Sequence, residues 1–89
     1  MKDVDNNPDQ LELDLRIAKK FVGRGIKFLR EKHGITQQNL EWYSGVQQNI
    51  ISTMESGKQD FKIEYLVRIA AAFNLNLVTF FEVCLTVPR

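Results

Sequence analysis

Apolar side chains recur at three- and four-residue intervals along most of the chain, which is the period of an amphipathic helix. The pattern predicts five helices joined by short turns, and therefore an all-α fold. The first helix is expected to begin near Pro8 and to end at His33 and Gly34. The next two lie within residues 36–57, the fourth runs from Ile63 to Phe73, and the last runs from Asn76 to Leu85.

The first segment admits two interpretations. Asn7 is a suitable cap and Pro8 suits the first helical position, so a helix can begin here. Residues 11–17, however, alternate apolar and polar side chains, which is the period of a strand. We expect the helix, because three- and four-residue steps continue beyond residue 17. A break near Gly23 stays open, since Gly23 and Gly25 each cost a helix about 1 kcal/mol.

Residues 36–57 have the layout of a helix-turn-helix unit, in which Gly45 supplies the corner between two short helical patterns. The second pattern buries an apolar stripe and leaves amide and hydroxyl side chains outside it. Amide side chains carry a donor and an acceptor in one plane, which is the pairing that adenine offers in the major groove of DNA. The candidate base-reading residues are Gln47, Gln48, Asn49, Ser52 and Thr53.

From about residue 21 to residue 81, the chain resembles the phage repressor/Cro family, also called XRE-type helix-turn-helix domains. The matching pieces stand in order and without gaps; they include Gly25-Ile26, Gly34-Ile-Thr36-Gln37, Ser44-Gly45-Val46, Met54-Glu55-Ser-Gly57-Lys58 and Asn74-Leu75-Asn76-Leu77. The resemblance implies a five-helix repressor-like domain with an extended N-terminal first helix. It also implies sequence-specific binding to double-stranded DNA.

The start of the second helix is a candidate phosphate site. Thr36 and Gln37 lie where free backbone N–H groups and the helix dipole attract anions. The resemblance implies that Gln37 and the amides around it clamp the DNA backbone, and that Lys58 makes a second backbone contact. It further implies a structural ion pair between Arg30 and Glu55, which would tie the first helix to the end of the DNA-reading helix.

Glu41 and Lys62 depart from the pattern of the resembling family, and two aromatic residues follow Glu41. Glu41 stands where the family usually has alanine, so its side chain is expected to bend outward or to push two helices apart. Lys62 stands at a helix cap where serine or threonine is usual. Trp42 and Tyr43 are expected to pack or to form a wall against the DNA backbone; the alternative is a platform that stacks single-stranded bases.

Composition bounds the possible classes of protein. A chain of 89 residues suits one domain, expected at 7–87 after a disordered acidic tail at 1–6. Residues 1–15 carry net −4 and the remainder net +5, so the part expected to fold is basic. The basic side chains of the first helix suit either phosphate contact or a solvated face. One cysteine and one histidine exclude an internal disulfide and a tetrahedral zinc site built from the protein alone, and we expect no metal and no cofactor. We expect a cytoplasmic protein with no membrane span.

The last helix carries apolar residues on more than one face, which predicts a homodimer interface at Phe80, Phe81, Val83 and Leu85. The alternative is that the long first helix covers this surface.

The expected function is that of a small transcriptional regulator, of repressor or controller type, which binds an inverted repeat as a dimer. A protein-interaction module, such as an antitoxin or anti-repressor with weak or no DNA reading, is the alternative. No catalytic constellation is found, so we expect no enzyme.

Overall fold

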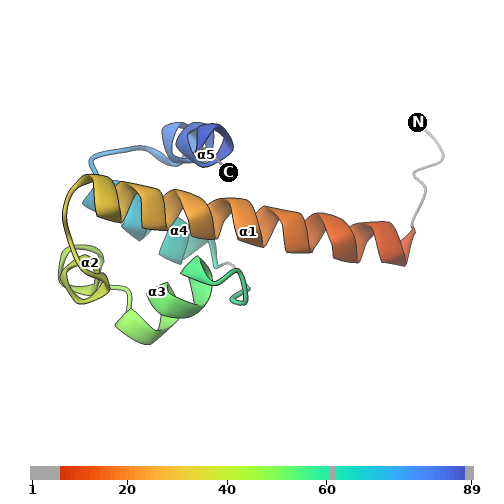
Figure 1. The fold of residues 1–89 in the computed structure, drawn as a ribbon, viewed down its shortest axis with the longest axis horizontal. Helices are drawn as coiled ribbons and strands as arrows, with labels where there is room; N and C mark the ends of the chain where they lie inside the picture. The colour runs from red at the N-terminus through yellow and green to blue at the C-terminus, as the bar shows by residue number, and fades with distance from the viewer. Residues whose placement is uncertain (1–6, 61, 88–89) are drawn as a thin grey trace.

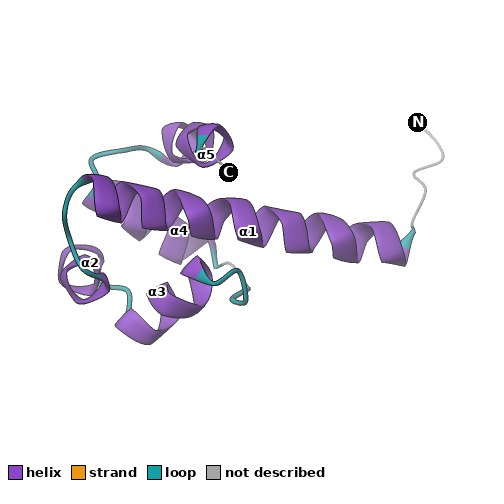
Figure 2. Cartoon of the chain, viewed as in Figure 1, coloured by secondary structure: helices purple, strands orange, loops and turns teal. Residues whose placement is uncertain are grey.

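The structure is a computed structural model that describes residues 7–60 and 62–87. The expected acidic tail at residues 1–6 lies outside the described residues. The helices are α1 (Pro8–Lys32), α2 (Gln37–Ser44), α3 (Gln48–Glu55), α4 (Ile63–Ala72) and α5 (Leu77–Thr86). Figure 2 shows helices and loops throughout, without a strand in the described part of the chain. The predicted all-α fold with five helices is confirmed.

Residues 8–32 form one uninterrupted helix, so the strand interpretation of residues 11–17 is wrong. Asn7 caps the helix, because its side-chain oxygen accepts hydrogen bonds from the N–H groups of Asp9 and Gln10 at 3.0 and 3.3 Å. Pro8 occupies the first helical position. The local cap signals outweigh the alternating pattern because this segment pairs with no strand that could use a period of two.

Gly23 and Gly25 do not break α1, and their missing side chains let other helices approach it. A Cβ atom on Gly23 would collide with the backbone carbonyl of Met54 in α3, and one on Gly25 would collide with the side chain of Cys84 in α5. Both glycines are buried. The cost of glycine in a helix is therefore offset by the close packing of α3 and α5 against α1.

Helix α1 runs along the longest dimension of the molecule, which measures 45 Å against 25 and 23 Å for the other two (Figure 1). Helices α2 and α3 lie on one side of α1, and α5 lies on the opposite side. The core between them is apolar, and its largest fully buried side chains are Phe80, Ile26, Leu40, Ile51, Met54, Ile69 and Val46. Helix α1 is therefore the element against which α3 and α5 are both positioned.

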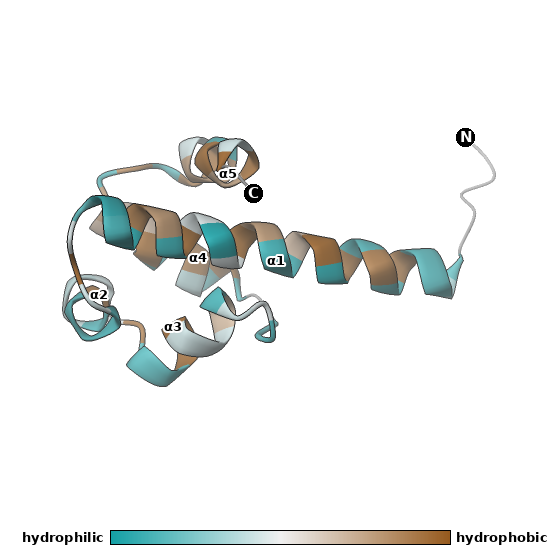
Figure 3. Cartoon of the chain, in the orientation of Figure 1, coloured by the Kyte–Doolittle hydropathy of each residue, from teal (hydrophilic) through white to brown (hydrophobic). Residues whose placement is uncertain are grey.

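The first three turns of α1 project beyond every other helix (Figure 1). Residues 8–18, which we call the arm, are all exposed, although the arm carries three leucines and one isoleucine. Figure 3 shows that hydrophobic bands continue from the packed half of α1 into the arm. The arm therefore exposes apolar surface that the core of the described chain does not use.

The close approach at Gly23 predicts an unusual stability effect. Glycine-to-alanine changes in helix interiors usually stabilise by about 0.5–1 kcal/mol. Gly23→Ala should instead lower the free energy of unfolding by about 1–3 kcal/mol, because the new methyl group displaces α3. Urea unfolding measures this change, and the pair Lys27→Ala and Lys27→Gly on the exposed face of α1 is the control, which should differ only by the helix-propensity cost. A Gly23→Ala variant as stable as the wild type would show that α3 does not pack closely here.

Candidate nucleic-acid interface

Three amide side chains begin α3 and face solvent. Gln47 is the N-cap of the helix, Gln48 and Asn49 occupy its first turn, and all three are exposed. The opposite side of α3 is anchored in the core by Ile51 and Met54, which are both 0% exposed. Since the buried side fixes the rotation of the helix, its first amide residues are presented outward together, as base readers require.

The two hydroxyl residues predicted to read bases lie about one turn of α3 beyond Asn49. Ser52 and Thr53 are both exposed. The hydroxyl of Thr53 donates toward the backbone oxygens of Asn49 and Ile50, and it lies 2.9 Å from the side-chain oxygen of Gln59. Thr53 is thus held by local contacts, and its methyl group is the part best suited to meet a thymine methyl.

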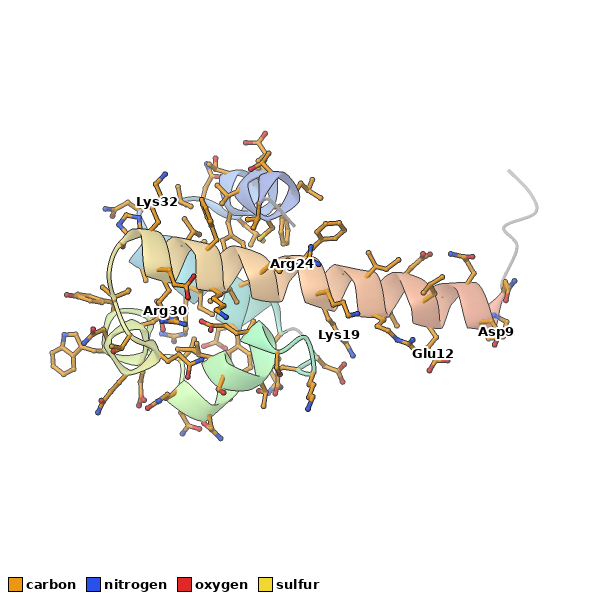
Figure 4. All side chains as sticks on the ribbon, in the orientation of Figure 1. Asp9, Glu12, Lys19, Arg24, Arg30 and Lys32 are labelled. Carbon is orange, nitrogen blue, oxygen red and sulfur yellow. The ribbon has the colours of Figure 1, made fainter. Side chains whose placement is uncertain are left out.

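Arg30 and Glu55 form the expected ion pair, which joins α1 to the last residue of α3. The Nε and Nη2 atoms of Arg30 donate to the two carboxylate oxygens of Glu55 at 2.8 and 3.0 Å. Its Nη1 atom donates to the backbone oxygen of Ile35 at 3.1 Å. Figure 4 shows Arg30 on the side of α1 that faces α2 and α3. The bidentate contact therefore sets the position of α3 relative to α1.

Burial makes this pair different from a surface salt bridge. The side chains of Arg30 and Glu55 are only 14% and 6% exposed. The hydrogen bond to Glu55 raises the pKa of Arg30 above its ordinary value, although burial acts in the opposite direction. Removal of either partner would leave a poorly solvated charge, which typically costs about 3–5 kcal/mol.

Gln37 is attached to the same pair. Its side-chain nitrogen donates to Glu55 Oε1 at 3.1 Å, so the amide of Gln37 is oriented by a residue at the far end of the helix-turn-helix unit. Thr36 caps α2 in a reciprocal capping box with Asn39, with two hydrogen bonds of 3.0 Å. An amide nitrogen has two hydrogens, and only one is used in the contact with Glu55. The other is available to an anion at the start of α2.

Lys58 follows α3 in a turn that the backbone fixes. Gly57 adopts the left-handed conformation with φ of 77°, and the N–H of Lys58 donates to the backbone oxygen of Thr53 at 3.0 Å. The Lys58 side chain is exposed. Lys20 of α1 lies alongside Gly57, so this basic turn is supported from the long helix.

Glu41 has a role that the sequence did not reveal. Its carboxylate oxygen Oε1 accepts a hydrogen bond from the backbone N–H of Gln48 at 3.1 Å, and so it caps α3 from the preceding helix. Gln47, the N-cap residue itself, makes no side-chain capping bond. The Glu41 side chain, which was expected to bend outward or to push the helices apart, is partly exposed and bends toward the start of α3. A negative charge at the positive end of a helix is favourable.

A buried serine completes the turn between α2 and α3. The hydroxyl of Ser44 donates to the backbone oxygen of Leu40 at 2.7 Å and accepts from the N–H of Val46 at 3.1 Å. Gly45, with φ of 76°, makes the corner. With Glu41 at its start and Glu55 at its end, α3 is held by polar contacts at both termini and by apolar contacts between them.

A comparison with protein families gives this geometry a context. The helix-turn-helix family model HTH_3 matches residues 26–80, which is more than half of the chain. The chain belongs to the helix-turn-helix family. The resemblance to XRE-type domains is thereby confirmed, and the proteins of this family are DNA-binding transcriptional regulators and not enzymes.

Individual helix-turn-helix proteins are similar to this chain. A competence pilus inhibition repressor of Acinetobacter baylyi is 37% identical over 60 residues, which cover 67% of this chain but only 54% of the repressor. The chain thus spans about half the length of that relative. An uncharacterised HTH-type transcriptional regulator of Sinorhizobium fredii, y4dJ, is 32% identical over 66 residues, which cover 74% of this chain and 82% of the regulator.

A solved structure supports the same fold. The crystal structure of a mutant of the restriction-modification controller protein C.Esp1396I superposes with a TM-score of 0.69 and 28% sequence identity. The match covers 75% of this chain and 85% of that protein.

Helix α5 does not present all of the residues expected at a dimer interface. Phe80 is 0% exposed and lies in the core, so it cannot contact another protein, and Val83 is partly buried against the core. Phe81 and Leu85 are 38% and 67% exposed. Helix α1 therefore covers one face of α5, and the face with Phe81 and Leu85 stays open.

The expectations for Lys62, Trp42 and Tyr43 have different outcomes. Lys62 is the N-cap of α4 and makes no side-chain capping bond. Its ammonium group lies 5.7 Å from the centre of the Tyr65 ring. Trp42 is 84% exposed, so packing against the domain is wrong for this residue, and a wall against the DNA backbone stays a prediction. Tyr43, although 63% exposed, lines a shallow hollow with His33, Ile35 and Phe73.

The described residues contain no group of three or more His, Cys, Asp and Glu side chains that could hold a metal ion. The one cysteine, Cys84, is buried, and burial raises the pKa of its thiol to about 11. No described helix is by itself long and apolar enough to cross a membrane. Helices α4 and α5 reach that length and apolarity only together, and they meet at an angle of 83°.

The cap supplied by Glu41 predicts that this residue stabilises α3. Glu41→Ala removes the acceptor and should lower the free energy of unfolding by about 1 kcal/mol, as other cap deletions do. Glu41→Gln keeps a side-chain oxygen and should lose less. Thermal melts of both variants measure the difference. If the alanine variant is as stable as the glutamine variant, the contact with Gln48 contributes nothing to the fold.

Proposed function

We propose that this protein is a small transcriptional regulator that reads a specific sequence of double-stranded DNA through the start of α3. The observation that carries the proposal is the exposed run of Gln47, Gln48 and Asn49 on a helix whose position is fixed at both ends. Hydrogen-bonding side chains in this position reach base edges when the helix enters the major groove. Membership of the helix-turn-helix family supports the same function.

Contacts with the DNA backbone would set the position of α3, the proposed reading helix, on the duplex. The start of α2, with Thr36 and the oriented amide of Gln37, offers donors to one phosphate. Lys58, in the turn after α3, offers a positive charge to another. Phosphate contacts set the register of a protein on the duplex, whereas base contacts supply the specificity.

The proposed form on DNA is a homodimer bound to an inverted repeat, in the cytoplasm of a bacterium or phage host. Repressor-like domains of this size read two half-sites related by twofold symmetry, and the open face of α5 with Phe81 and Leu85 is an apolar surface suited to a second copy. The half-sites should lie about one DNA turn apart on the same face of the duplex. A repressor and a controller protein are both consistent with this form.

Selection of short duplexes from a random pool tests the proposal as a whole. We expect retained duplexes to share two inverted half-sites at a constant spacing. Retention of unrelated sequences at equal affinity would contradict sequence-specific reading. A protein that retains no duplex would support the second candidate, a protein-interaction module, which the 84% exposure of Trp42 on α2 favours.

The base-reading assignment predicts a loss of specificity. Gln48→Ala or Asn49→Ala should weaken binding to the selected operator by about 1–3 kcal/mol for each bidentate pairing with a base that the substitution removes. Binding to random DNA should stay unchanged, and titrations on both duplexes measure this. Both side chains are exposed, so the melting temperature should not fall. An equal weakening on operator and random DNA would remove these residues from base reading.

The backbone assignment predicts a change in salt dependence. Lys58→Ala should weaken binding to all duplexes and reduce the slope of log affinity against log salt concentration by about one unit. Gln37→Ala should weaken binding with little change in slope, because an amide is neutral. Lys32, which lies on the α5 side of α1 in Figure 4, supplies the control variant Lys32→Ala. If Lys58→Ala and Lys32→Ala have the same slope, Lys58 does not contact phosphate.

A further inference from the structure

The arm exposes more apolar surface than a solvated helix requires. Leu11, Leu13, Leu15 and Ile17 are 61, 44, 51 and 43% exposed. A short helix that packs against nothing is only marginally stable in water, and most helices in proteins are stabilised by burial of an apolar face. The arm therefore has the composition of a segment that packs against something else.

One apolar stripe runs from the core of the domain into the arm. Its positions are separated alternately by four and three residues, which is the spacing of the seam between two paired helices. The stripe consists of Leu11, Leu15, Ala18, Val22, Gly25 and Leu29. The last three are buried within the protein's own core, whereas the first three face solvent. Half of the seam is thus without a partner in the described structure.

The stripe leads into an apolar hollow between α1 and α5. The hollow has a volume of about 310 Å³ and is lined by Ala18, Phe21, Val22, Phe81, Cys84 and Leu85. Ala18 belongs to both the stripe and the hollow, and Phe81 and Leu85 are the exposed residues of α5. The arm, the hollow and the open face of α5 therefore form one continuous apolar surface.

The charges on the arm indicate which partner fits this surface. The arm carries Asp9, Glu12 and Asp14 and then Arg16, and the next turn of α1 adds Lys20 and Lys19, of which Lys19 also pairs with Asp60 at 2.6 Å. A second copy laid antiparallel places the acidic part of each helix beside the basic part of the other. A parallel copy places like charges together. Charge complementarity thus favours an antiparallel second copy.

We propose that the arm is a dimerisation element that pairs antiparallel with the arm of a second copy. With a twofold axis between Leu15 and Ala18, Leu15 lies level with the partner's Ala18, and Leu11 lies level with the partner's Val22. Leu11 of each copy then reaches the hollow of the other. The inference rests on the homodimer of the proposed function, and it assigns the surface and the direction of the pairing.

Two matched substitutions on the arm test the assignment without DNA. Leu15 and Leu13 are 51% and 44% exposed and lie two residues apart, on opposite sides of the helix. Leu15→Lys should convert the dimer to a monomer in sedimentation at micromolar concentration, with the melting of the core retained. Leu13→Lys should remain a dimer. Equal behaviour of the two variants, or a monomeric wild type, would overturn the proposal.

Cross-linking tests the direction of the pairing. In the antiparallel pair, Glu12 of one copy lies about 3 Å along the axis from the partner's Lys19, whereas the two Glu12 residues lie about 13 Å apart along it. A protein carrying both Glu12→Cys and Lys19→Cys should form disulfide-linked dimers, and the Glu12→Cys variant alone should not. The same two positions are about 10 Å apart within one helix, which excludes an internal bridge. A dimer in which the double variant does not cross-link would refute the antiparallel arrangement.

These outcomes are separate from those of the DNA-binding experiments. The wild type can retain selected duplexes and yet sediment as a monomer, in which case DNA reading stands and the arm pairing fails. It can also dimerise through the arm and retain no duplex, in which case the arm pairing stands and DNA reading fails. Native Cys84 is buried and should not contribute to cross-linking at neutral pH.

Discussion

The bidentate contact between Arg30 and Glu55 is the interaction on which the geometry of the interface depends. One guanidinium group connects α1, the backbone oxygen of Ile35 before α2, and the last residue of α3. Gln37 adds α2 to the same carboxylate. Because these groups are largely withdrawn from water, the contact is directional and costly to break. The orientation of α3 and the orientation of Gln37, the predicted phosphate donor, therefore depend on one carboxylate.

Glu41 supplies the corresponding constraint at the other end of α3. Without it the N–H group of Gln48, the first residue of the helix, would lack this side-chain acceptor, since Gln47 does not cap its own helix. A cap supplied from α2 also leaves the side chain of Gln47 without a capping role, as the proposed base reading requires. The residue that departs most from the family pattern thus contributes to the rigidity of the helix-turn-helix unit, in which α2 and α3 are joined by contacts at the turn and at both helix ends.

Local signals in the sequence were sufficient to predict most of the helices and turns of the fold. Asn7, Thr36 and Asn76 cap helices as their residue types predict, and Asn74 adopts a left-handed conformation with φ of 59°. The contacts that the sequence did not reveal join residues on different elements. The role of Glu41 depends on where its flexible side chain turns, and the role of Gly23 depends on how closely α3 approaches. Neither follows from periodicity, because periodicity describes one helix at a time.

The continuity of α1 connects the two surfaces of the protein. Arg30 near one end of this helix holds α3, and the arm at the other end carries the apolar seam. A helix of 25 residues without a break is about 37 Å long and transmits position along its length with little bending. If two arms pair, the distance between the two reading helices is set by the same rigid elements that orient each of them. Gly23 and Gly25, which allow α3 and α5 to pack tightly against this helix, would then contribute to the spacing of the half-sites as well as to stability.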